Sequence, residues 1–237
     1  MLTYGDRTKA IAITALEEVH GLLEGRGINF RVIGGSAVIA VLQSCSASDM
    51  ASQYVGTLDV DLATADLTSR NELREVLLRA GARPDEGNPD RVWLPVAVDD
   101  EQLEAPVDVV ALALLSSVPS GSGGAILAVP FLLLSKIRPY SNDGEKSKDG
   151  YDVYMLLAFG AGGPEAAAER CAQELPPDLA DELLRLVEVF FLTTRKAARH
   201  AAVMLRDYHA MGRRDALADV MNIAERFVRT LRGRLDA

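Results

Sequence analysis

The spacing of apolar residues changes partway along the chain, and this change limits the folds that the chain can adopt. Up to residue 112, stretches with the two-residue period of strands alternate with stretches of helical spacing. After residue 124, only helical spacing is found. Alternating helices and strands indicate an α/β layer, whereas a run of helices indicates a helical layer. We therefore predict an α+β protein, with an N-terminal α/β core containing a mixed sheet (residues 1–124) and a C-terminal helical domain (residues 125–237).

The boundaries of the predicted elements follow from this spacing and from glycine, proline and asparagine residues between the periodic stretches. A predicted capping box at Ser69 and Glu72 starts one of the helices. Residues 43–56 are predicted to be a loop or a short helix, and the Ser/Gly/Pro cluster at 116–124 a domain boundary. The predicted strands are 28–33, 57–63, 91–98 and 106–112. The predicted helices are 8–24, 37–42, 69–80, 130–137, 145–158, 164–173, 177–207 and 213–235.

Composition and the absence of several motifs exclude some classes of protein. The two cysteines form no CxxC pair, which argues against a zinc site, and no GxxxxGK[ST] sequence indicates a P-loop. The N-terminus lacks the apolar core of a signal peptide, and the longest apolar run, residues 125–134, is too short to span a bilayer. We therefore expect a cytoplasmic protein with no membrane partner.

The distribution of charge bears on binding to nucleic acids. The net charge is −9, which disfavours general nucleic-acid binding because phosphate contacts need an excess of Lys and Arg. Residues 195–237 are an exception, with ten Lys and Arg against five Asp and Glu. This segment predicts a pair of solvated amphipathic helices, which we favour, or a surface that meets a polyanion.

Two carboxylates alternate with apolar residues in the predicted strand 57–63. Asp59 and Asp61 lie two residues apart, so their side chains share one face while Val60 points to the other. Two carboxylates this close repel each other unless a cation or a proton neutralises them, and hard oxygen ligands suit Mg²⁺. The alternative is a solvated Asp-x-Asp pair on an edge strand.

A third carboxylate and a glycine-rich turn strengthen the first interpretation. Asp108 lies in an otherwise apolar strand, where a carboxylate needs a partner or a metal ion, unless it occupies a strand end or an open face. Gly34-Gly35-Ser36 lies between a predicted strand and a predicted helix. Two glycines let the backbone approach a phosphate, and a helix N-terminus offers free N–H groups to an anion. A plain turn with an N-cap serine would have the same sequence.

In this order, the Gly-Ser turn, the Asp-x-Asp strand and the later Asp resemble the polymerase-β-like nucleotidyltransferase superfamily. The resemblance implies transfer of a nucleoside monophosphate from an NTP to an acceptor hydroxyl with Mg²⁺, two ions being expected. Residues 43–56 would be an insertion, because the gap between the serine and the Asp-x-Asp pair is longer than usual in that superfamily. The resemblance implies triphosphate binding by Gly34, Gly35 and Ser36, metal binding by Asp59, Asp61 and Asp108, and a general base at Asp108.

The second half of the chain is similar to the AbiEii-type nucleotidyltransferases, which include toxins of toxin–antitoxin pairs. The similarity is carried by Val129-Pro130-Phe131 through Lys136, and by Lys148-Asp149-Gly150-Tyr151-Asp152. It implies that Lys136 contacts the triphosphate and that Lys148, Asp149 and Asp152 line the nucleotide side of the site. A surface ion pair is the alternative for Lys148 and Asp152, which are four residues apart.

The sequence alone leaves open which molecule accepts the nucleoside monophosphate. The toxin-like resemblance implies a tRNA 3′ end and a cognate antitoxin partner. Other enzymes of the superfamily imply a protein side chain or a small molecule such as an aminoglycoside or lincosamide. A non-catalytic module that binds a nucleotide or a partner protein is the rival from a different class, and the presence of all three carboxylates argues against it.

Overall fold

The computed structural model describes residues 4–45, 54, 58–112, 115, 126–142, 144, 146–209 and 211–237. The chain divides into two compact units, of which the first comprises Met1–Ala37 and Val55–Leu127. The second comprises Val38–Tyr54 and Ala128–Ala237. The units differ from the predicted domains chiefly in residues 38–54, which belong to the second unit although most of the first unit follows them in sequence. The domains at 1–124 and 125–237 stay a prediction.

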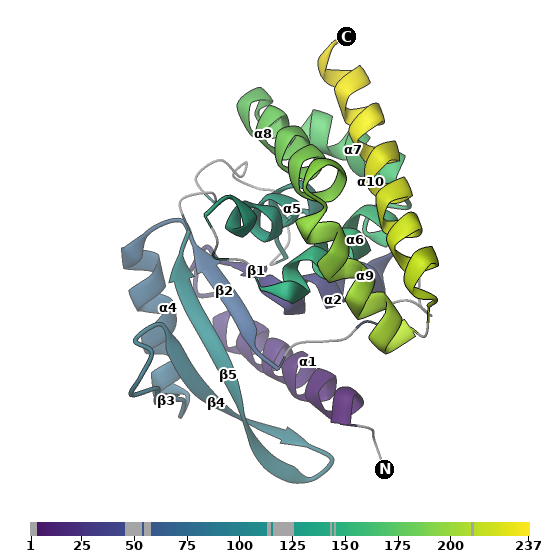
Figure 1. Ribbon diagram of the computed structural model, residues 1–237. Helices are drawn as coiled ribbons and strands as arrows, with labels where there is room; N and C mark the ends of the chain where they lie inside the picture. The colour runs from purple at the N-terminus through teal and green to yellow at the C-terminus, as the bar shows by residue number, and fades with distance from the viewer. Residues whose placement is uncertain are drawn as a thin grey trace. The chain divides into compact units, whose positions relative to one another are not determined.

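The first unit is built on a mixed five-stranded sheet with the strand order β1-β2-β5-β4-β3 (Figure 1). Strands β2 and β5 at its centre are parallel, whereas the other neighbouring pairs are antiparallel. The predicted mixed sheet is therefore confirmed. The strands are β1 (Arg31–Ile33), β2 (Val60–Thr64), β3 (Arg83–Pro84), β4 (Arg91–Val98) and β5 (Glu101–Ala111).

One face of this sheet forms the core of the first unit with two helices. Helices α1 (Tyr4–Leu23) and α4 (Leu67–Arg79) both contact β2, β4 and β5, and they also contact each other. Alternation along the strands places Val60, Val107 and Val92 in register on this face, where all three are fully buried. The next residue along each of these two central strands, Asp61 after Val60 and Asp108 after Val107, therefore points to the opposite face.

The second unit is helical in its described part, as the spacing after residue 124 predicts. Gly150 lies in the first turn of α6, where an added Cβ would meet the carbonyl oxygen of Ala197 at 2.5 Å, so α6 and α9 pack unusually closely there. Among the described residues, no helix is both long and apolar enough to cross a membrane. The elements after the sheet are α5 (Val129–Ile137), η2 (Arg138–Ser141), α6 (Ser147–Phe159), α7 (Pro164–Glu174), α8 (Pro177–Val187), η3 (Glu188–Thr193), α9 (Lys196–His209) and α10 (Arg213–Leu235).

Two local predictions are wrong. Helix α4 begins two residues before Ser69, because the carboxylate of Asp66 caps it and accepts the Ser69 N–H at 2.8 Å. The predicted helix 177–207 is interrupted by the π-helical turn η3, in which the N–H and hydroxyl of Thr194 both bond to the carbonyl of Val189. Arg195 then has a positive φ of 58°. No glycine or proline marks this break in the sequence, since all eight residues from Glu188 to Arg195 are of other types.

Candidate functional site

The central strand pair brings the three predicted carboxylates of the first unit together. Asp61 on β2 lies opposite Asp108 on β5 in the parallel ladder. Asp59 precedes β2, and both Asp59 and Asp108 contact one arginine, which shows that the two carboxylates are neighbours. The structure therefore brings these three residues to the same part of the sheet.

The arginine that joins them is Arg91, the first residue of β4. It lies opposite Asp108 in the antiparallel ladder, and its Nε and Nη2 donate to both oxygens of Asp108 at 2.7 and 2.8 Å. Nη2 also donates to Oδ2 of Asp59 at 3.0 Å. The bidentate bond to Asp108 raises the pKa of Arg91 above its ordinary value, and the nearby carboxylate charges add to this effect. Together they outweigh the opposite effect of partial burial, so the guanidinium stays charged. Sequence analysis missed this residue, because its role depends on the register of two strands.

Gly34 and Ser36 begin helix α2 (Gly34–Ser44) directly after β1. Gly34 has a φ of +67°, and a Cβ built on it would overlap the carboxylate of Asp61. The glycine is therefore required both by its backbone conformation and by the close approach of Asp61. Ser36 is buried, and its hydroxyl donates to the carbonyl of Ile33 at 3.2 Å.

The start of α2 consequently lies beside the carboxylates. The glycines and the serine form the first helical turn rather than a turn ahead of the helix, so their N–H groups are among those without an intrahelical acceptor. Gly35 belongs to this turn as well. Such a turn can bind an anion, as the sequence predicts for the triphosphate.

The carboxylates are suited to a divalent cation by their chemistry, because they offer hard oxygen ligands. Asp61 lies beside the start of α2, and Asp59 accepts a hydrogen bond from Arg91 at one oxygen. Asp108 differs, because Arg91 holds both of its oxygens. Within the described part of the chain, no group of three or more acidic, histidine or cysteine side chains is arranged to hold a metal ion. The metal-binding roles stay predictions, and Asp59 with Asp61 is the pair that fits them.

The second unit gathers the other four predicted site residues into one ionic cluster. Asp152 on α6 is fully buried and lies between two lysines. Lys136 Nζ lies 2.7 Å from its Oδ2, and Lys148 Nζ lies 2.8 Å from its Oδ1. Lys136 also reaches Oδ1 of Asp149 at 3.2 Å. The surface ion pair considered as an alternative is therefore wrong for Asp152, which the structure places in the interior.

Tyr54 completes this cluster and comes from the predicted insertion at residues 43–56. Its hydroxyl donates to Oδ1 of Asp152 at 2.6 Å and accepts a hydrogen bond from Lys148 at 2.6 Å. The Lys148 ammonium lies 4.7 Å from the centre of the Tyr54 ring, which stacks on Tyr151 at 5.5 Å. The rest of the insertion lies largely outside the described residues. Sequence analysis missed Tyr54, because no motif surrounds it.

Burial and charge set the protonation states in this cluster. Burial lowers the pKa of Lys148, although the adjacent Asp152 opposes this shift. Burial alone would raise the pKa of Asp152, but the charges of Lys148 and Lys136 outweigh it and lower the pKa below its ordinary value. Burial, followed by the charge of Asp152, raises the pKa of Tyr54. Asp152 is therefore a carboxylate that holds two ammonium groups.

The other tyrosines near this cluster belong to the core. Tyr140, Tyr151 and Tyr154 are buried, and each hydroxyl has a partner within the second unit. These partners are His200 for Tyr140, His209 for Tyr151 and Asp219 for Tyr154, at 2.9, 2.7 and 2.6 Å. Because these rings are buried, a nucleotide base cannot stack on them in this structure.

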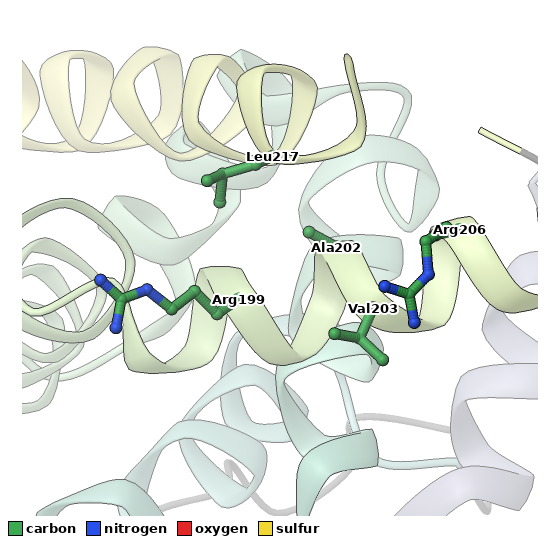
Figure 2. A pocket seen from close by; sticks show the side chains of 5 residues that line it. All are labelled: Arg199, Ala202, Val203, Arg206 and Leu217. Atoms are coloured by element: carbon green, nitrogen blue, oxygen red, sulfur yellow. The ribbon is translucent and has the colours of Figure 1, made fainter. Parts of the chain in front are cut away.

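The basic C-terminal segment is partly neutralised within the second unit. Arg226, Arg232 and Arg234 of α10 form ion pairs with glutamates of α7 and η3. On helix α9, Arg206 pairs with Asp207 of the same helix at 2.7 Å. Arg206 and Arg199 line a hollow of about 300 Å³ that Leu217 of α10 also lines. Figure 2 shows this hollow, with Ala202 and Val203 between the two arginines on the same helix. The hollow therefore has two guanidinium groups in its lining, both from α9.

The architecture of the chain is shared with two solved structures, and it is consistent with a nucleotidyltransferase fold. One such structure is JHP933 from Helicobacter pylori, with a TM-score of 0.54 and 14% identity, covering 98% of this chain and 96% of that chain. A second is a provisionally assigned nucleotidyltransferase from H. pylori, with a TM-score of 0.54 and 12% identity, covering 98% of both chains. At these identities the likeness is one of fold. No protein-family model and no curated protein matches the sequence, so membership of the AbiEii-type family stays a prediction.

The contact between Gly34 and Asp61 predicts a specific cost for adding one methyl group. We expect Gly34→Ala to lower the free energy of unfolding by about 3 kcal/mol, from the positive φ and from the overlap with the carboxylate. Gly27→Ala is the matched control, because its φ is +72° and nothing lies within 4 Å of the added Cβ. It should cost only about 1 kcal/mol. Urea unfolding of both variants measures the difference, and equal losses would contradict the close contact.

The buried charge of Asp152 predicts a second stability effect. Asp152→Asn leaves Lys136 and Lys148 without their shared counter-charge, so we expect a loss of about 3 kcal/mol in the free energy of unfolding. Glu174→Gln removes a carboxylate from a partly exposed ion pair with Arg170 on the same helix, and should change stability by less than about 0.5 kcal/mol. Thermal or urea unfolding at neutral pH tests this, and a change at Asp152 as small as that at Glu174 would refute the interpretation.

Proposed function

We propose that the protein transfers a nucleoside monophosphate from an NTP to an acceptor hydroxyl. In this reaction the acceptor oxygen forms a bond to the α-phosphorus, the bond from that phosphorus to the β-phosphate bridging oxygen breaks, and pyrophosphate leaves. One observation carries the proposal: Asp61, in register with Asp108 on a nucleotidyltransferase fold, packs against the glycine that starts α2. This arrangement combines carboxylates with a helix start that can bind an anion.

Asp59 and Asp61 would hold Mg²⁺, with two ions expected and Asp108 as the third carboxylate. Bound there, Mg²⁺ would neutralise charge on the phosphates during the transfer. The first turn of α2, from Gly34 through Gly35 to Ser36, would bind triphosphate oxygens through backbone N–H groups. Asp108 would accept the proton of the acceptor hydroxyl, once its oxygens are released from Arg91.

As the resemblance to AbiEii-type enzymes implies, Lys136 would contact the triphosphate and stabilise the charge that accumulates on the leaving pyrophosphate. Lys148, Asp149 and Asp152 would line the nucleotide side of the site. Each ammonium has three N–H donors, and Asp152 fixes the direction of both groups. Asp149 supports this arrangement by pairing with Lys136 and by accepting the N–H of Lys146 at 2.9 Å. We therefore assign the two aspartates to positioning and the two lysines to contact with the nucleotide.

The acceptor that we favour is the 3′ end of a tRNA, as for a toxin of the AbiEii type with a cognate antitoxin. The hollow on α9 supports an RNA acceptor, because Arg199 and Arg206 lie at its edges. A small-molecule or protein acceptor is the second candidate, and the net charge of −9 favours a cationic drug over a polyanion. A module that binds a nucleotide without transferring it is the rival from another class.

Transfer of label from NTPs tests the reaction directly. The protein is incubated with each of four α-³²P-labelled NTPs and Mg²⁺, together with total RNA. We expect label in RNA, and a loss of at least about a hundredfold in Asp61→Asn, because transition-state charge stabilisation of this kind contributes on that order. Glu104→Gln is the control, since Glu104 is another sheet carboxylate paired with an arginine, here Arg83, but it lies outside the carboxylate cluster.

The outcomes of this experiment separate the candidate functions. Label on the protein alone would indicate a protein acceptor, and label on neither would call for a screen of aminoglycosides and lincosamides. Absence of Mg²⁺-dependent NTP binding by calorimetry would rule out nucleotidyl transfer. NTP binding without transfer to any acceptor would support the binding module.

The cationic hollow on α9 predicts a separate effect on RNA. We expect Arg199→Glu/Arg206→Glu to weaken tRNA binding at least roughly tenfold at low salt, with a shallower dependence on salt, since two phosphate contacts are lost. Arg229→Glu/Arg232→Glu on α10 changes the charge by the same amount elsewhere in the second unit. Filter binding at two salt concentrations measures both variants, and equal losses would show that the hollow has no special role.

A further inference from the structure

Arg91 on β4 differs from Arg83 on the neighbouring strand β3 in the carboxylates that it contacts. Arg83 pairs with Glu104 alone, and both side chains of that pair are about half exposed. Arg91 is 26% exposed and bridges Asp59 and Asp108, which are 33% and 18% exposed. Arg91 donates hydrogen bonds of 2.7, 2.8 and 3.0 Å, and all three go to carboxylates proposed to bind metal ions.

A guanidinium and a divalent cation compete when they need the same oxygens. Both oxygens of Asp108 and Oδ2 of Asp59 accept N–H bonds from Arg91, so neither carboxylate can offer those lone pairs to a metal without loss of a charge-assisted bond. Arg91 also adds one positive charge beside the three carboxylates, which repels a second cation. The ladder fixes its backbone opposite Asp108, so only the side chain can move away.

We infer that Arg91 is a built-in counter-cation that a divalent metal ion must displace, and that it makes binding of the free ion weak. This inference rests on the proposed function, because it places the metal at the same carboxylates. Once displaced, the guanidinium is a free donor beside the proposed triphosphate site, where phosphate oxygens can accept the bonds that it gave to Asp108. Arg91 thereby favours loading of the site by a metal ion together with an NTP over loading by the ion alone.

Titration with Mn²⁺ alone, followed by the EPR signal of the free ion, tests the inference without any measurement of activity. We expect Arg91→Gln to bind Mn²⁺ at least roughly tenfold more tightly than the wild-type protein. Arg91→Lys keeps the charge but loses the bidentate geometry, so its affinity should fall between the two. Arg83→Gln is the matched control, with the same charge change on the same sheet, and should stay within about twofold of the wild type.

The site of the ion and the folding of the variants are checked in the same series. Asp61→Asn combined with Arg91→Gln should abolish the gain in affinity, because the ion then lacks a ligand. Circular dichroism spectra confirm that each variant is folded, and Arg91→Lys serves for the comparison if Arg91→Gln does not fold. The inference is overturned if neither Arg91 variant binds Mn²⁺ more tightly, or if Arg83→Gln gains as much.

The failure of this inference differs from a failure of the proposed function. Nucleotidyl transfer by the wild-type protein, with unchanged Mn²⁺ affinity in both Arg91 variants, would refute only the role of Arg91. Tighter Mn²⁺ binding in those variants, without nucleotidyl transfer from any NTP by the wild-type protein, would support the role of Arg91 as a counter-cation. The same result would refute the proposed nucleotidyl transfer.

Discussion

The pairing of β2 with β5 is the constraint on which the geometry of the first unit depends. These two strands run parallel in a sheet whose other pairs are antiparallel, and the register sets Asp61 directly beside Asp108. The same register places Val60 beside Val107 on the buried face, so the hydrophobic core fixes the positions of the carboxylates. A shift by one residue would turn the valines out and the aspartates into the core, at a large cost in free energy.

The second unit relies on a different interaction, the burial of one carboxylate between two ammonium groups. Asp152 is inaccessible to solvent, and such a charge is tolerable only because the ammonium groups of Lys136 and Lys148 offset it. Tyr54 and Lys148 also donate hydrogen bonds to its Oδ1. An apolar residue would fill the same space without this network. The retention of a buried ionic cluster in an otherwise apolar helix core is therefore better explained by the lysines that it directs than by stability.

The parts of the fold that local pattern determines could be predicted from sequence, and those that depend on long-range register could not. The strand at residues 91–98 and the helix at 213–235 match β4 and α10, because alternation and helical spacing are strong there. The carboxylates and lysines were identified through motifs, and the structure gathers them in two clusters. Arg91 and Tyr54 lie in no motif, since one acts through strand pairing and the other through a contact with Asp152, 98 positions later in the chain.

Arg91 also shows why an acidic pattern by itself leaves the chemistry of a site undetermined. In the sequence, Asp59, Asp61 and Asp108 are three unbalanced negative charges, and a metal ion is the obvious way to balance them. In the folded chain, an arginine from a neighbouring strand already supplies part of that balance. The carboxylates can therefore be held close together without a metal ion, which leaves metal binding available as a step of the proposed reaction.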